Sequence, residues 1–270
     1  MKKQTVVHII PTYNEKENIT AMLRILDKLA KKDKKRLHKV LVVDDNSPDG
    51  TGKIVKMLAQ KDKKIYLVTG KKKGLGSAMI RGLRYATSQL KADIVVSNEA
   101  DFAFDPKHIP YMLEKLDMGF DVVIGSRHIG SGKTEGWTVN RKVNHWVANT
   151  LFASWIAGVS EIKDHNGAFR AIRVRGVLDK INLENLNATG FGFFNYFLFR
   201  LTQVTSKFHE FPIVYKFRTA GESKVSFNPK YFKTYLRDVS EYITLSMSIR
   251  VEKIISRLNS KNQTAASCPD

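Results

Sequence analysis

"IVVSNEADFAFDP", residues 94–106, joins an apolar run to a pair of carboxylates, and this stretch decides the fold that we predict. Residues 94–96 are β-branched, as is typical of a buried strand. Glu99 and Asp101 follow where this strand is expected to end. Side chains two residues apart in an extended chain point to the same side. The stretch therefore predicts a buried strand that presents two carboxylates together at its carboxyl end.

Similar apolar runs lie on both sides of this strand along the chain, at residues 6–10, 40–43, 65–68 and 122–124. Between them, apolar residues recur at helical spacing in residues 19–30, 51–60, 77–90 and 106–116. Alternating strands and helices predict an α/β fold with a largely parallel sheet covered by helices. One further strand is expected at residues 211–217.

Polar loops follow the first four expected strands. They read PTYNE at residues 11–15, DDNSPDG at 44–50, KGLG at 73–76 and EAD at 99–101. The carboxyl ends of parallel strands meet at one edge of the sheet, where such folds bind ligands. We therefore expect a binding site that these loops share.

Composition restricts the class of protein. The chain has 270 residues, enough for one large α/β domain with appendages, and its net charge of +19 favours anionic partners such as phosphorylated substrates, anionic lipid or nucleic acid. Its one cysteine, Cys268, allows no disulfide within the chain and no cysteine zinc site. Residues 143–159 are too short and too polar for a membrane span, and the N-terminus is expected to form a strand, not a signal peptide. A cytoplasmic setting fits.

The acid pair suits a hard divalent cation. Glu99 and Asp101 offer the oxygen ligands that Mg²⁺ or Mn²⁺ prefer. A cation there could neutralise a departing nucleotide diphosphate. Taken alone, the same spacing also fits a helix cap at Asp101 or Asp105.

Several motifs together resemble the family 2 glycosyltransferases, and most nearly those that make dolichol-phosphate (polyprenyl-phosphate) mannose. They are VHIIPTYNE, VLVVDDNSPDGT, KKKGLGSAMIRGL, EADFAFDP, VVIGSRHI and FPIVYKFRTAGESK, in that order from about residue 5 to residue 227. The resemblance implies a GT-A fold and an inverting, metal-dependent, non-processive enzyme that uses Mg²⁺ or Mn²⁺. It implies transfer of a sugar, with mannose from GDP-mannose expected, to a polyprenyl or dolichyl phosphate at the cytoplasmic face of a membrane.

The resemblance also implies roles for individual residues. Donor binding falls to Pro11, Tyr13, Glu15, Asp44, Asp45, Lys73, Gly74, Ala100 and Asp101. The metal ligands would be Glu99 and Asp101. The acceptor phosphate would meet Arg127, Arg141, Arg218 and Lys224. The catalytic residues would be Asp101, Arg127 and Arg218.

Some positions depart from the family pattern. Glu99 stands where the family has Asp, and Ala103 stands where it has a polar residue. The turn at residues 164–170 reads DHNGAFR, with His165 and Asn166 departing from the family's D-x-T-S-G-F-R, and Tyr196 replaces an acid. We expect intact donor binding, weaker metal binding and an altered acceptor pocket.

The reaction leaves alternatives open. A phosphate acceptor needs no general base, because its oxygen is already charged, whereas a hydroxyl acceptor does. Asp164 is the best candidate base, with His165 in reserve, although both also suit hydrogen bonding within a turn. The alternatives are a UDP donor with another phosphate or hydroxyl acceptor, and a catalytically weakened nucleotide-sugar-binding scaffold. Nucleic-acid binding is not expected, because no helix-turn-helix or zinc pattern is present.

The chain is expected to divide into a domain at residues 1–227, an amphipathic helical segment at 228–259 and a disordered tail at 260–270. The helical segment carries an apolar stripe that could pack on the domain, which we favour, or rest on an anionic membrane. The stripe comprises Phe232, Tyr235, Leu236, Val239 and Ile243. A membrane-anchoring subunit is left open as a further partner. The aromatic stretch 191–199, His145 and Trp146 are expected in the core or an interface.

Overall fold

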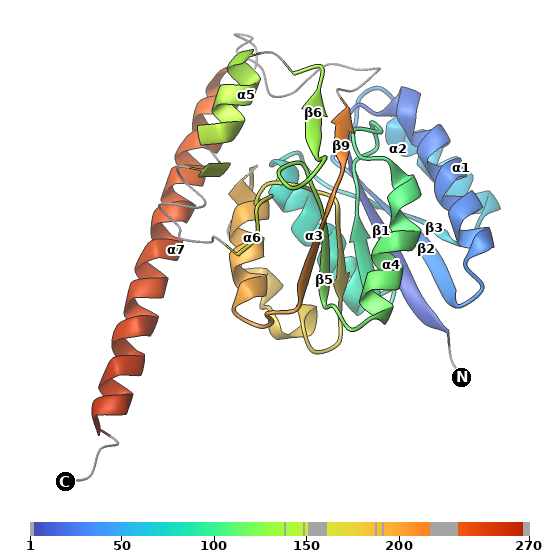
Figure 1. Cartoon of the computed structure of the whole chain (residues 1–270). Coiled ribbons are helices and arrows are strands. Elements are labelled where there is room, and N and C mark those ends of the chain that lie inside the picture. Colours follow the sequence, from blue (N-terminus) through green and yellow to red (C-terminus); the bar gives the residue numbers. More distant parts are fainter. Residues whose placement is uncertain are drawn as a thin grey trace.

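The computed structural model describes residues 3–137, 139–147, 149–150, 161–186, 188–190, 192–216 and 232–266. Within them, a seven-stranded sheet has the order β3-β2-β1-β4-β7-β5-β8 (Figure 1). Its strands are β1 Gln4–Thr12, β2 Arg36–Asp44, β3 Ile65–Thr69, β4 Ile94–Ser97, β5 Val122–Ser126, β7 Arg170–Arg173 and β8 Phe208–Pro212. Only β7 runs antiparallel to its neighbours. The predicted α/β fold with a mostly parallel sheet is confirmed.

Helices cover both faces of this sheet. The α-helices are α1 Lys16–Lys32, α2 Thr51–Lys61, α3 Leu75–Ser88, α4 Ile109–Asp117, α5 Val139–Trp146, α6 Gly192–Thr202 and α7 Phe232–Ala266. Short 3-10 helices are η1 Pro106–His108, η3 Leu178–Lys180 and η4 Leu183–Asn185. In Figure 1, α1 and α4 lie on one side of the sheet, α3 and α6 lie on the other, and α7 lies outside α6.

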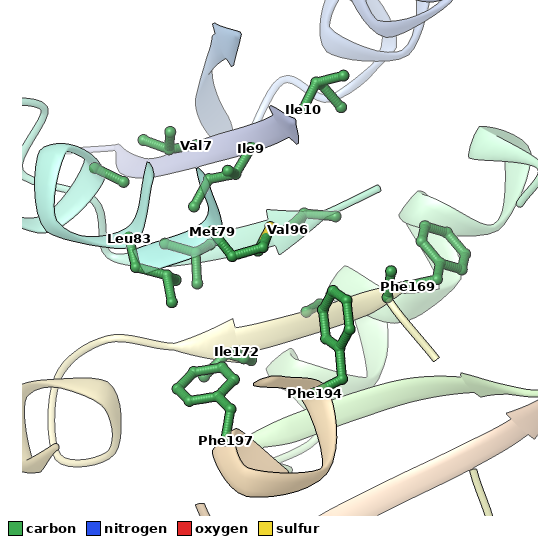
Figure 2. Packing of buried hydrophobic residues seen from close by; sticks show 14 of the residues in the cluster. Val7, Ile9, Ile10, Met79, Leu83, Val96, Phe169, Ile172, Phe194 and Phe197 are labelled. Atoms are coloured by element: carbon green, nitrogen blue, oxygen red, sulfur yellow. The ribbon is translucent and has the colours of Figure 1, made fainter. Parts of the chain in front are cut away.

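The core forms between the apolar faces of the helices and the sheet. Figure 2 shows Val7 and Ile9 of β1 beside Met79 and Leu83 of α3, all of them buried. A Cβ on Gly82 would come within 2.6 Å of the Ile9 side chain, so the glycine lets α3 approach the sheet closely. Full burial of a side chain of this size contributes about 1.5–3 kcal/mol.

The aromatic stretch predicted to be core is confirmed in α6. Phe193, Phe194, Phe197 and Phe199 are all buried. Figure 2 shows Phe194 and Phe197 close to Ile172 of β7. Trp146 is 59% exposed on α5, so it does not lie in the core, and the alternative of an interface stays a prediction. The side chain of His145 is not among those described.

The second half of the sheet corrects the predicted strands. The single strand expected at 211–217 is two: β8 ends at Pro212, and β9, Val214–Lys216, pairs with β6, Lys133–Glu135, in a separate small sheet. The intervening Ile213 donates its N–H to Ser126 O at 2.9 Å, which closes the β5–β8 ladder. Strands β6 and β7 are too short to show an alternating pattern, and the sequence did not predict them.

The C-terminal helix packs on α6, as favoured, and its buried residues are Tyr242, Ser246 and Ile249. Of the predicted stripe, Val239 and Ile243 are half-buried and Leu236 is 50% exposed, while the side chains of Phe232 and Tyr235 are not among those described. The helix also continues to Ala266, past residue 259 where its end was predicted, into the segment expected to be disordered. No helix among the described residues is both long and apolar enough to cross a bilayer.

Candidate active site

The ends of β1 and β2 are joined by a buried aspartate. The strand register sets Thr12 opposite Asp44. Thr12 Oγ1 donates to Asp44 Oδ1 at 2.9 Å, and Ser47 donates its backbone N–H to Oδ2 at 2.9 Å and its hydroxyl to Oδ1 at 2.6 Å. Asp44 is only 1% exposed. Its buried carboxylate therefore fixes the conformation of the loop after β2.

The loops after β1 and β2 are also joined by hydrogen bonds from backbone N–H groups to side-chain hydroxyls. Asn14 N donates to Ser47 Oγ and Glu15 N donates to Thr51 Oγ1, both at 3.0 Å. Asn14 has a φ of 58°, a left-handed conformation that asparagine adopts more readily than most residues. Glu15 is buried and accepts a hydrogen bond from Asn18 Nδ2 at 2.9 Å. Of the residues expected to bind the nucleoside, Pro11 and Tyr13 are partly exposed, while Glu15 and Asp44 are buried.

Two cations that the sequence analysis did not single out lie beside these loops. Lys72 Nζ lies 3.6 Å from the centroid of the Tyr13 ring, and Arg81 Nη2 donates to Asp45 Oδ1 at 2.5 Å. Burial raises the pKa of Asp45, and the hydrogen bond and charge of Arg81 offset this only in part. Lys73, the predicted donor contact, is exposed. In a run of three lysines, no sequence signal separates Lys72 from Lys73.

The acid pair follows β4 as predicted. Asp101 is 4% exposed, and its Oδ1 accepts the backbone N–H of Ala103 at 3.1 Å. Phe102 between them has a φ of 61°, which is rare for a bulky residue and typical of functional loops. Glu99 is partly exposed, and Asn98 Nδ2 next to it is buried without a hydrogen-bond partner among the described residues. Ala103 and the predicted donor contact Ala100 are both packed in the hydrophobic core.

Glu99 and Asp101 fit a divalent cation that the protein coordinates only in part. Glu99 and Asp101 supply carboxylate oxygens of the type that Mg²⁺ and Mn²⁺ bind. Among the described residues, no group of three or more His, Cys, Asp or Glu side chains converges on one point. A cation at this pair would therefore need further oxygens from a diphosphate or from water.

Arg127, after β5, forms a buried ion pair with Asp164. Its Nε donates to Oδ2 at 2.7 Å, its Nη2 donates to Oδ1 at 2.6 Å, and its backbone N donates to Oδ2 at 2.9 Å. Burial opposes ionisation of Asp164, but the charge and hydrogen bonds of Arg127 outweigh it and hold the pKa of Asp164 well below its usual range. The pKa of Arg127 is raised despite its burial, chiefly by Asp164 and to a smaller extent by Glu99.

This ion pair changes the interpretation of Asp164. A carboxylate that accepts three hydrogen bonds from one arginine and is 0% exposed is poorly suited to remove a proton from a substrate. The hydrogen-bonding role considered for Asp164 is confirmed. His165 is also buried, and its backbone N–H donates to Asn149 Oδ1 at 3.1 Å.

A basic, aromatic pocket of about 430 Å³ is lined in part by Arg127. It is lined by Arg127, His128, Lys133, Thr134, Trp137, Lys142, Trp146, Asn149 and Thr150. Lys133 and Lys142 carry no sequence signal that would have selected them. The predicted phosphate contact Arg141 lies on α5, but its side chain is not among those described, and Arg218 and Lys224 lie outside the described residues.

The chain is similar in sequence to curated polyprenyl-phosphate mannosyltransferases. The chain is 35% identical over 223 residues to the undecaprenyl-phosphate mannosyltransferase of Micrococcus luteus. This alignment covers 82% of this chain and 87% of that protein. It is 32% identical over 247 residues to the dolichol-phosphate mannosyltransferase of Pyrococcus furiosus. This second alignment covers 92% of this chain and 65% of that protein.

Solved structures support the GT-A fold. Glucosyl-3-phosphoglycerate synthase from Mycobacterium tuberculosis, in complex with Mn²⁺, UDP and glucosyl-3-phosphoglycerate, aligns with a TM-score of 0.60. The alignment covers 90% of this chain and 80% of that one at 18% identity. The model of the family described as glycosyl transferase family 2 matches residues 8–180, a span that begins in β1 and contains the polar loops, the acid pair and the Arg127–Asp164 pair. The chain therefore belongs to glycosyl transferase family 2.

Proposed function

We propose that this glycosyltransferase moves a sugar, with mannose from GDP-mannose as the expected case, to a polyprenyl phosphate with inversion at the sugar carbon. The observation that carries the proposal is the position of Arg127. It lines the basic pocket, and the charge of Glu99 is among those that raise its pKa. A residue of a pocket suited to a phosphate is thus close enough to the acid pair to interact with Glu99. The relatives named as polyprenyl-phosphate mannosyltransferases support the choice of acceptor.

On the donor side, Glu99 and Asp101 would hold Mg²⁺ or Mn²⁺. When bound, the cation would neutralise charge on the departing diphosphate. The hydrogen bond from Ala103 N fixes one oxygen of Asp101 and orients the other. Pro11 and Tyr13 offer partly exposed surface for the base and ribose.

On the acceptor side, the chain needs no general base. A phosphate monoester carries about −1.5 to −2 charges at neutral pH, so its oxygen is already nucleophilic. Lys133 and Lys142 supply positive charge in the pocket, and Trp137 and Trp146 supply apolar wall for the first isoprene units.

The same proposal places the enzyme on the cytoplasmic face of an anionic membrane. Val139, Val143 and Trp146 are exposed on α5 beside the pocket, and the net charge of +19 attracts anionic lipid. Through this surface the enzyme would reach an acceptor that remains in the bilayer.

The direct test supplies purified protein with Mn²⁺, a polyprenyl phosphate and a panel of radiolabelled GDP- and UDP-sugars, and measures label in lipid. GDP-mannose is expected to give the fastest transfer. Asp101→Asn is expected to lower turnover about 100-fold or more, because charge stabilisation of the leaving group is lost. Asp105→Asn is the matched control, since Asp105 instead caps η1 by accepting from Lys107 N. Full activity of Asp101→Asn would contradict the metal assignment.

A second measurement addresses the metal itself. Glu99 has a longer arm than the aspartate of the family pattern, and we expect weak Mn²⁺ binding that strengthens when GDP is present. Glu99→Asp is expected to bind Mn²⁺ more tightly than the natural chain. Tight Mn²⁺ binding by the natural chain, or none with GDP present, would contradict this expectation.

A further inference from the structure

Helix α7 reaches the loop at residues 188–190 through one carboxylate. Glu241 Oε1 accepts the backbone N–H of Thr189 at 2.5 Å and its hydroxyl at 2.9 Å. Glu241 Oε2 accepts the backbone N–H of Gly190 at 2.6 Å. One side chain of α7 therefore holds two consecutive backbone amides by charge-assisted hydrogen bonds, which are stronger than neutral ones.

The same loop rests on the first turn of α3. Thr189 O accepts the N–H of Gly76 at 2.8 Å and that of Ser77 at 3.3 Å. Gly74 has a φ of 127°, and a Cβ there would overlap Thr189 O. A Cβ on Gly76 would likewise overlap Ala188 O. The two glycines therefore let the loop backbone lie directly against the Gly74–Leu75–Gly76 turn, and Thr189 O holds the turn there through two hydrogen bonds.

Helix α7 is itself anchored around Glu241. Tyr242, the next residue, is buried, and its hydroxyl accepts from Asn166 Nδ2 at 3.1 Å. The α7 backbone packs against Gly192 of α6, where an added Cβ would come within 3.3 Å of the Tyr242 Cα. Figure 1 shows α7 alongside α6, and α6 alongside α3. Glu241 thus extends from a fixed point of the fold.

We propose that Glu241 is a positioning residue for the donor: through Thr189 it sets the Gly74–Leu75–Gly76 turn against which the nucleotide diphosphate binds. The proposal rests on the proposed function and on the donor contacts that the family resemblance implies for Lys73 and Gly74, at the start of this turn. Glu241 acts through the loop and touches neither substrate. It follows that its loss weakens donor binding more than acceptor binding.

The test compares Glu241→Gln with Glu252→Gln in the full chain. Glutamine keeps the shape of Glu241, but its NH₂ group cannot accept the backbone N–H hydrogen bond that a carboxylate oxygen accepts at that place. Glu252, on the same helix, pairs with Arg200 at 2.8 Å and is the matched control. Calorimetric titration with GDP and steady-state kinetics are measured on both variants and on the natural chain.

For Glu241→Gln we expect GDP affinity to fall about tenfold, which corresponds to about 1.4 kcal/mol, with a matching rise in the donor KM. The KM for polyprenyl phosphate is expected to stay within about twofold, because the pocket at Arg127 is unchanged. Hydrogen exchange at the amides of residues 76–77 is expected to accelerate in Glu241→Gln and not in Glu252→Gln. Thr189→Val, which removes only the hydroxyl bond, should weaken GDP binding about threefold.

Two failures are distinguishable. If the natural chain binds no nucleotide, the proposed function is overturned, and this inference with it. If the natural chain binds GDP and both Glu241→Gln and Thr189→Val bind it equally well, only the role of Glu241 is overturned. Equal increases of the donor and acceptor KM values would also overturn it, since they indicate a general structural effect.

Discussion

The donor loops and the acceptor turn of the candidate site are stabilised in different ways. The loops after β1 and β2 are held by several moderate hydrogen bonds, such as those that Asp44 accepts from Thr12 and Ser47. The acceptor turn contains, besides hydrogen bonds such as those from Asp164 N to Glu210 and from His165 N to Asn149, a fully buried ion pair between Arg127 and Asp164. Many moderate bonds can be lost one at a time, whereas a buried ion pair leaves an uncompensated charge when either partner is removed. The acceptor side should therefore be the more fragile of the two.

The largest expected effect is that of Asp164→Asn. Removing the charge leaves Arg127 buried without its counter-ion, and we expect a loss of about 3–5 kcal/mol in the free energy of unfolding. Asp45→Asn is the comparison on the donor side, where Arg81 is 25% exposed, and there we expect about 1 kcal/mol. Urea unfolding measures both. Equal losses for the two variants would contradict the contrast. Any loss of turnover in Asp164→Asn would reflect Arg127 and would not indicate a hydroxyl acceptor.

Acid should destabilise the fold first through its buried histidines, among which His8 has a large shift. Burial, and to a smaller extent the charge of His38, lowers the pKa of His8 in β1 to about 3. A lowered histidine pKa favours the neutral form in the folded chain, so its contribution is complete above the unfolded pKa of 6.5 and is lost as pH falls from there toward 3. We expect unfolding free energy to fall on the order of 1 kcal/mol per pH unit in this window.

The lowered pKa of Asp164 affects the unfolding free energy at lower pH than that of His8 does. Its contribution is present above the ordinary carboxylate pKa and is lost only as pH falls below that value. Urea titrations at neutral pH and at about pH 5 separate Asp164 from the histidines, because burial also lowers the pKa values of His38, His108, His128 and His209, which add to the effect of His8 in this interval. Stability that stays constant over this interval would contradict the neutral, buried state of His8.

A smaller effect is expected for Thr12→Val. The change removes one hydrogen bond to Asp44 and keeps the shape of the side chain, while both bonds from Ser47 remain. We expect a loss of about 1 kcal/mol in stability, with a modest loss of GDP affinity. Chemical denaturation and calorimetry measure the two quantities. A loss as large as that of Asp164→Asn would contradict the distribution of stability over several moderate bonds in the donor loops.

The smallest effect on stability is expected for Trp146→Ala. The side chain is 59% exposed on α5, so its removal should change the unfolding free energy by less than about 0.5 kcal/mol. The KM for polyprenyl phosphate should nevertheless rise severalfold, because Trp146 lines the basic pocket. Kinetics with long and short prenyl chains measure this effect. An unchanged KM would remove Trp146 from the acceptor site.

The donor half could be predicted from sequence because its information is local. Each buried strand is a continuous β-branched run, and each is followed at once by its polar loop, as in residues 40–50. Parallel pairing then brings the loop ends together without further assumptions. The position of the acid pair after β4 followed from the same logic.

The acceptor half could not be predicted in this way because its contacts join distant residues. Arg127 and Asp164 are 37 positions apart, and neither sequence neighbourhood indicates the pairing. Strand β7 has four residues and takes its place only from its antiparallel partners. A helical pattern predicted an amphipathic C-terminal segment, but it could not show that Glu241 meets Thr189.

The insertion of β7 between β4 and β5 has a consequence for synthesis of the chain. Within the described sheet, β5 has no neighbour other than β7 and β8, both of which come later in the sequence. A ribosome that has released β5 but not β7 therefore carries a nascent chain with an open strand edge on β4 and an unpaired β5, and such edges invite aggregation. Pauses in translation before residue 173 should thus require chaperones more than pauses after it.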